Sequence, residues 1–161
     1  MDVVFIDNLF VFFALVYYVS LIVVYLLRAH ELGELELKMG PWFSIQLIPF
    51  SLLWVINLLY FYYVSRLITG LPIIIFLIYD LWYRWITKKK PVHHPDRWPA
   101  GLVLYLVLLF IGCIGLNWYG FLMSDFYGNV LVIAFFVMMS SFGYYQYRYR
   151  KGKQAQEGKI T

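Results

Sequence analysis

Five apolar stretches, each long enough to cross a membrane as a helix, constrain the fold of this chain more than any other feature. They cover approximately residues 3–27, 42–64, 67–86, 100–119 and 127–147. A helix needs about 20 mostly apolar residues to cross a hydrocarbon layer of roughly 30 Å. The runs are unbroken, whereas the strands of a membrane barrel would alternate between polar and apolar residues. The sequence therefore predicts an all-α integral membrane protein, with residues 1–147 forming a single bundle of about five transmembrane helices.

The second and third apolar runs are separated only by residues 65–70, SRLITG, with Pro72 following shortly after. A single helix through both runs would be far too long for one bilayer. Because glycine and proline commonly mark turns, we expect a tight reversal at residues 65–70.

The composition agrees with a membrane protein: 63% of the 161 residues are hydrophobic and only 14% are charged. Soluble domains are about half apolar and about a quarter charged. The first run lacks the basic region and small-residue cleavage site of a signal peptide, so it is interpreted as a permanent span. The single cysteine, Cys113, rules out a disulfide within the chain and a zinc site built from paired thiolates.

The cations lie almost entirely on one predicted side of the membrane. All 13 lysines and arginines except Arg66 fall in two loops and the tail, at Arg28, Lys38, Arg84, Lys88, Lys89, Lys90, Arg97, Arg148, Arg150, Lys151, Lys153 and Lys159. The positive-inside rule then predicts an N-terminus outside and a C-terminus inside, in a cell membrane or an organelle inner membrane.

The same cations are candidates for contact with lipids. We expect Lys88, Lys89, Lys90, Arg97, Arg148, Arg150 and Lys151 to set the topology and to lie near anionic head groups. The last three residues of this set belong to a basic polar tail, residues 148–161.

Few polar side chains interrupt the spans. Asp80 is the one acid well inside a predicted span, and Arg84 follows it by one helical turn. Residues four positions apart share a helix face, so the two are expected to neutralise each other. Because ionisable groups inside a membrane are functional candidates, a role for Asp80 in proton or ion transfer is the alternative.

Other intramembrane residues predict seams between helices. Gln46 and Asn57 lie near one face of the second run, where their amides need partners within the protein. This face is interpreted as a packing surface, with a pocket for a lipid or quinone-like ligand as the alternative. Gly112 and Gly115 provide a small surface for close helix approach.

The inner loops hold the residues best suited to a metal or to catalysis, namely His30, Glu31, Glu34, His93, His94 and Asp96. Imidazole and carboxylate groups are ligands of zinc, iron and manganese. No HExxH motif is present, so the loops are also interpreted simply as solvated connectors. All three histidines lie in loops, which disfavours b-type haem between the helices, and no cofactor is predicted.

Three functions are consistent with this pattern. The sparse chemistry and short loops favour a non-catalytic structural subunit of a larger membrane complex, such as an energy-transducing or respiratory one, that packs through its helices and binds lipid. One alternative is a small enzyme acting on lipid or prenyl substrates at the inner face with a histidine and carboxylate metal site. A homo-oligomeric channel or carrier is the other. The predicted partners are lipids, including anionic lipids, and other membrane subunits, with no nucleic acid.

Overall fold

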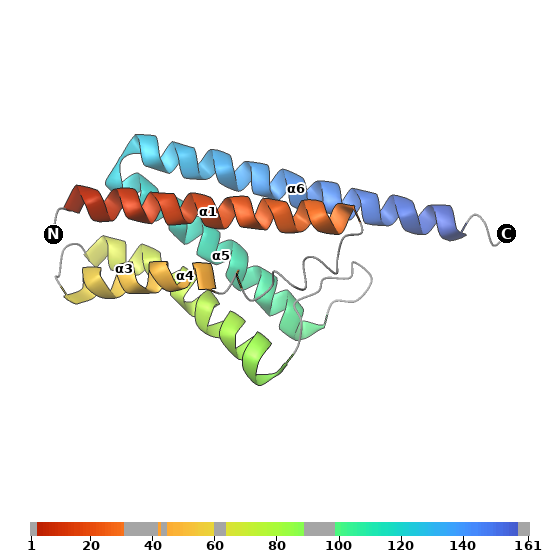
Figure 1. Cartoon of the computed structure of the whole chain (residues 1–161), viewed down its shortest axis with the longest axis horizontal. Coiled ribbons are helices and arrows are strands. Elements are labelled where there is room, and N and C mark those ends of the chain that lie inside the picture. Colours follow the sequence, from red (N-terminus) through yellow and green to blue (C-terminus); the bar gives the residue numbers. More distant parts are fainter. Residues whose placement is uncertain (1–2, 31–41, 43–44, 60–63, 89–98, 158–161) are drawn as a thin grey trace.

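The computed structural model describes residues 3–30, 42, 45–59, 64–88 and 99–157. The elements are α1 (Val3–Ala29), α3 (Ile48–Leu59), α4 (Val64–Leu81), the π-helix η1 (Trp82–Ile86), α5 (Ala100–Met123) and α6 (Asp125–Glu157), as shown in Figure 1. Every one of these elements is a helix, so the prediction of an all-α fold is confirmed for the part of the chain that is described.

Four helices are long and apolar enough to cross a membrane. They cover Phe5–Ala29, Val64–Ile86, Ala100–Met123 and Asp125–Ala155. These four correspond to the first, third, fourth and fifth predicted spans, which supports a multi-pass bundle. The longest described helix that begins in the remaining run and lies wholly within it is α3, whose 12 residues extend only about 18 Å at 1.5 Å per residue. A fifth span and the orientation of the termini stay predictions.

Two boundaries differ from the sequence-based expectation. Residues 65–70 do not form a turn, because they lie inside α4, which begins at Val64. Gly70 serves helix packing instead, since a Cβ there would lie 2.7 Å from Cδ1 of Trp54 on α3. At the other end, α6 continues past residue 147 to Glu157, so much of the predicted polar tail is helical.

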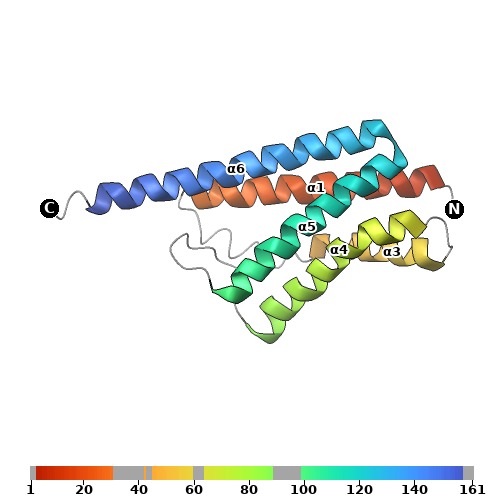
Figure 2. The ribbon, with the colours of Figure 1, turned by 180° about the vertical axis from the view of Figure 1, so that it is seen from behind.

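The helices are arranged as two pairs joined at one end. Helix α1 packs along α6, α4 packs along α5, and α5 also contacts α6, while α3 contacts α4 and α1. Figures 1 and 2 show that α4 and the beginning of α5 diverge from the α1–α6 pair towards the end where η1 lies. The pairs therefore meet most closely at the end where α5 leads into α6.

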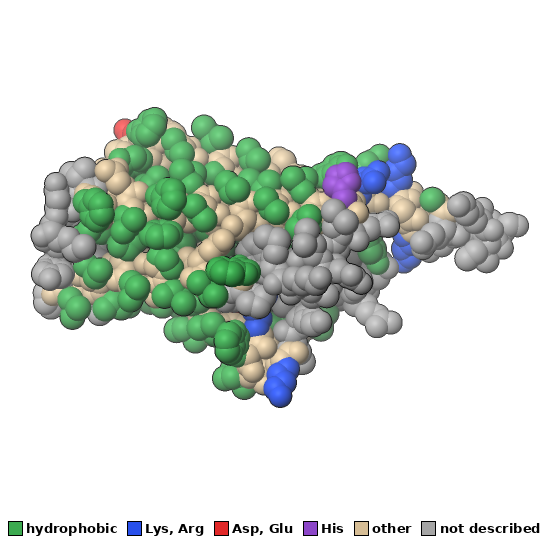
Figure 3. Space-filling model, viewed as in Figure 1, with side chains coloured by type: hydrophobic (Ala, Val, Ile, Leu, Met, Phe, Trp, Pro, Cys, Tyr) green, Lys and Arg blue, Asp and Glu red, His purple; other side chains and the backbone are tan. Residues whose placement is uncertain are grey.

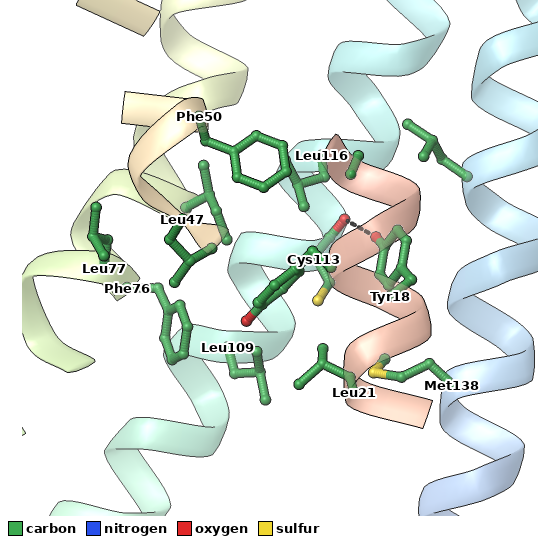
Figure 4. Close-up of a cluster of buried hydrophobic side chains, with 14 of the residues drawn as sticks. Tyr18, Leu21, Leu47, Phe50, Phe76, Leu77, Leu109, Cys113, Leu116 and Met138 are labelled. Carbon is green, nitrogen blue, oxygen red and sulfur yellow. Dashed lines mark hydrogen bonds between the residues drawn. The ribbon is translucent and has the colours of Figure 1, made fainter. Parts of the chain in front are cut away.

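The core between these helices is rich in aromatic side chains. Tyr17, Tyr18 and Phe50 are almost completely buried. The rings of Phe10 on α1 and Tyr119 on α5 stack with centroids 3.9 Å apart. Figure 4 shows Phe50, Phe76 and Tyr18 converging on the stretch of α5 that carries Cys113 and Leu116. Because lipid chains are as apolar as these side chains, the gain from this packing is mainly van der Waals contact.

The predicted glycine seam lies between α4 and α5. A Cβ on Gly115 would lie 2.5 Å from the carbonyl oxygen of Thr69, and one on Gly112 would lie 3.0 Å from Cδ1 of Ile73. The first distance is too short for any side chain, so only glycine allows the two backbones to approach this closely. The seam therefore sets how closely α5 packs against α4.

Candidate functional site

A buried cluster of Asp80, Arg84 and Tyr105 is the main polar feature inside the bundle. Asp80 is only 1% exposed. Nε of Arg84 donates a hydrogen bond to Oδ1 of Asp80 at 2.6 Å, and the Tyr105 hydroxyl donates to the same oxygen at 2.8 Å. A terminal guanidinium nitrogen of Arg84 lies 3.2 Å from the Tyr105 hydroxyl, which accepts from it. The three groups therefore form a closed triangle with no net charge.

Local structure places each member of the cluster. Asp80 lies in the last turn of α4, Arg84 lies in η1, and Tyr105 comes from the second turn of α5. The helices are held together here by a hydrogen bond from the Tyr79 hydroxyl to the carbonyl oxygen of Gly101, at 2.9 Å. The cluster thus combines an ion pair within one helical segment with a link to the neighbouring helix.

A second ion pair joins α1 to α4 at the opposite end of the α4–η1 segment. The two terminal nitrogens of Arg66 donate to the two carboxylate oxygens of Asp7 at 2.6 and 3.1 Å. Both side chains are mostly buried, at 10% and 13% exposed. The guanidinium carbon lies 5.8 Å from the ring centroid of Tyr119 on α5, within the range of a cation–π contact. Arg66 of α4 therefore links its own helix to two others, α1 and α5.

Neutral hydrogen bonds complete the links between helices. The Tyr18 hydroxyl on α1 lies 2.8 Å from Oδ1 of Asn117 and 3.0 Å from the carbonyl oxygen of Cys113, both on α5. Its single proton can be donated to one of them at a time. The Trp54 indole on α3 donates to the carbonyl oxygen of Leu67 on α4 at 3.0 Å. Each bond ties two helices through a group that would otherwise face hydrocarbon unpaired.

The outer surface of α5 carries a shallow groove of about 390 Å³. It is lined by Ile114, Asn117, Trp118 and Phe121. Trp118 is 57% exposed, whereas Asn117 is buried and bonded to Tyr18. The groove is therefore an apolar surface with one amide at its base.

The predicted loop site lies almost wholly outside the described residues. This is true of Glu31, Glu34, His93, His94 and Asp96. His30 is described, and its exposed ring lies beside that of Tyr144, with centroids 6.3 Å apart. Within the described ranges no group of three or more His, Cys, Asp or Glu residues is arranged to hold a metal. The metal and catalytic roles of these residues stay predictions.

Other predicted residues can be placed only in part. The Oε1 atom of Gln46 is buried and has no hydrogen-bond partner among the groups that the structure describes. The side chain of Asn57 and the residues Lys89, Lys90 and Arg97 lie outside the described set. Lys88 is exposed and has a positive φ of 53° where the chain leaves η1. The quinone or lipid pocket proposed for the second run therefore stays untested.

Sequence reasoning identified Asp80 and Arg84 but missed Tyr105 and the pair of Asp7 with Arg66. The four-residue spacing made the first pair visible, whereas the second pair is separated by 59 positions. The sequence does hold one signal, because Arg66 is the only cation on the predicted outer side and Asp7 lies near the outer end of the first apolar run. An isolated acid and an isolated cation at one membrane face are natural partners.

Comparison with known proteins returns no match to a family model, a curated protein or a solved structure. The class defined by the fold is a helical bundle with four described helices long and apolar enough to cross a membrane.

Proposed function

We propose that this protein is a non-catalytic structural subunit of a larger membrane assembly. The observation that carries the proposal is the pairing of the charged groups inside the bundle. Asp7 pairs with Arg66, and Asp80 pairs with Arg84, in contacts that also involve tyrosines of α5. These groups link helices, so they are suited to holding a rigid framework.

The same pairing weighs against a transport role for Asp80. A carboxylate that passes protons or cations must exchange partners during each cycle. Asp80 is 1% exposed, and Oδ1 accepts two hydrogen bonds, from Arg84 and Tyr105. Releasing either bond would leave a buried charge poorly compensated, which is strongly unfavourable in a low-dielectric interior.

A structural subunit must also offer a surface to its neighbours. The groove on α5 meets this requirement, because Ile114 and Trp118 are both more than half exposed, at 52% and 57%. Large aromatic side chains are frequent anchors of interfaces between proteins. We propose that a neighbouring membrane subunit contacts the protein at this groove.

Purification of the full chain from its native membrane in a mild detergent tests the proposal. We expect other membrane proteins to copurify in a fixed ratio, and Trp118→Ala to reduce their recovery several-fold. Phe136→Ala is the matched control, since Phe136 is a similarly exposed aromatic residue (63%) on α6. Recovery of the wild-type chain without companions would contradict the proposal, and equal losses with both variants would contradict the placement at the groove.

A further inference from the structure

Helix α6 extends well beyond the thickness of a membrane. Its 33 residues span about 50 Å at 1.5 Å per residue, compared with roughly 30 Å for the hydrocarbon layer. Figure 1 shows that its C-terminal part continues past the end of α1. The segment from Tyr144 to Ala155 contains Arg148, Arg150, Lys151 and Lys153 and no acidic residue. A basic helical segment thus emerges directly from an apolar one.

Two exposed tyrosines mark where the apolar part ends. Tyr144 and Tyr147 are 40% and 61% exposed, and tyrosines of this kind concentrate at the membrane interface. In Figure 3 this end of the molecule carries several blue cationic side chains, whereas the face over α1 and α6 is largely hydrophobic. The cations of α6 therefore begin directly after the tyrosines that mark the membrane interface.

The rise of the helix sets the depth of these cations. Lys153 lies six residues beyond Tyr147, which corresponds to about 9 Å along the axis. The head-group region on one side of a bilayer is about 5–8 Å thick, from the difference between the full and the hydrocarbon thickness. Arg148, Arg150 and Lys151 thus start within this layer, at the level of the lipid phosphates, and Lys153 starts just beyond it.

The directions of the cations indicate what surrounds them. Successive residues of a helix point about 100° apart, so residues 148, 150, 151 and 153 are distributed around α6 and do not form one stripe. All four side chains are exposed. A docked protein would contact one side of the helix, whereas lipid head groups surround a helix on every open side.

We infer that the segment from Arg148 to Lys153 is a binding collar for anionic phospholipids, in which phosphate groups of several lipids contact the cations around α6. Arg28, in the last turn of α1, lies at the same end of the bundle and adds to the positive charge. Lysine and arginine near a membrane surface attract anionic lipids in this way. The collar is a property of the single chain and does not depend on the proposed assembly.

The inference is tested with the purified full chain in nanodiscs of phosphatidylcholine containing a minor fraction of phosphatidylglycerol. After the protein is released from the nanodisc, the lipids that remain bound to it are counted by native mass spectrometry. We expect phosphatidylglycerol to be enriched over its share in the disc by at least about fivefold, the factor that one basic residue near an anionic surface contributes. Combined Arg148→Gln, Arg150→Gln, Lys151→Gln and Lys153→Gln should lower the enrichment several-fold.

The matched control is Arg148→Lys with Arg150→Lys, which keeps the charge and should keep the enrichment. A second measurement needs no variant and raises the salt from about 0.1 M to about 1 M. This shortens the screening length from about 10 Å to about 3 Å. The enrichment of phosphatidylglycerol should then fall. The inference is overturned if wild-type protein shows no preference, or if the preference survives both the four glutamine substitutions and the high salt.

Discussion

The guanidinium group of Arg66 is joined to the carboxylate of Asp7 by two hydrogen bonds, at 2.6 and 3.1 Å, across 59 positions of sequence. The pair fixes the beginning of α4 against the beginning of α1, and Tyr119 of α5 lies beneath the guanidinium. Paired charges of this geometry are strongly coupled, because neither is well solvated on its own.

Asp7→Ala should therefore destabilise the bundle by about 3 kcal/mol, the lower end of what the loss of one partner from a buried pair costs. The double variant Asp7→Leu, Arg66→Met should lower the free energy of unfolding by less than Asp7→Ala does, because it leaves no unpaired charge in the apolar interior. Unfolding by sodium dodecyl sulfate in mixed micelles measures both. Asp125→Ala, which removes an exposed acid at the start of α6, is the control and should change the free energy of unfolding by less than about 1 kcal/mol.

Tyr105→Phe removes one hydroxyl and leaves the aromatic packing of α5 in place. Asp80 then loses a donor and Arg84 loses an acceptor, so we expect the free energy of unfolding to fall by about 1–3 kcal/mol. Tyr144→Phe, at a tyrosine 40% exposed, should have almost no effect. Equal stability of the Tyr105 variant and the wild type in the same unfolding assay would show that the triangle does not stabilise the bundle.

Gly115→Ala should weaken the contact between α4 and α5. The new methyl group would lie 2.5 Å from a backbone oxygen of Thr69, so the helices must separate, at a cost of about 1–3 kcal/mol. Gly143→Ala is a matched control, because a Cβ at Gly143 meets nothing within 4 Å. Since alanine is the better helix former by up to about 1 kcal/mol, the control should be neutral or slightly stabilising. If Gly143→Ala unfolds at a lower temperature than Gly115→Ala, the close packing of α4 and α5 at Gly115 is contradicted.

Cys113 provides a reporter of the whole bundle. Its side chain is completely buried, and it is the single cysteine of the chain. A thiol that reacts only when the helices separate should be labelled slowly by a maleimide in the folded protein and quickly after denaturation. Asp7→Ala and Gly115→Ala should both accelerate the labelling under native conditions. Rapid labelling of the folded wild type would show that α5 does not pack against α4, α6 and α1 as described.

The sequence carried the information for the helices but only part of the information for their contacts. Long apolar runs predict helices directly, and the spacing of Asp80 and Arg84 predicts their pairing within one segment. Tyr105, Asp7 and Arg66 could not be placed with them, because contacts between distant segments depend on how the helices are ordered and rotated. The turn expected at residues 65–70 failed for a related reason. Gly70 lies in α4 because it packs against Trp54, and a glycine used for packing has the same sequence signal as one used for a turn.

The extension of α6 was also not apparent from composition. Residues 148–157 belong to the polar, basic tail that the sequence predicts beyond the last span, yet they continue the helix of that span. A helix already formed extends without a new nucleation step, and lysine, arginine and glutamine are good helix formers. Hydropathy marks where the apolar environment ends and does not mark where the helix ends.

We propose that this chain works as a structural part of a larger membrane assembly. The most direct test is the mass of the native particle that contains it, measured by native mass spectrometry after gentle extraction from its own membrane. We expect a particle much heavier than the 19.2 kDa chain, with other membrane proteins present in fixed stoichiometry. A particle that contains only this chain and bound lipid would contradict this proposal.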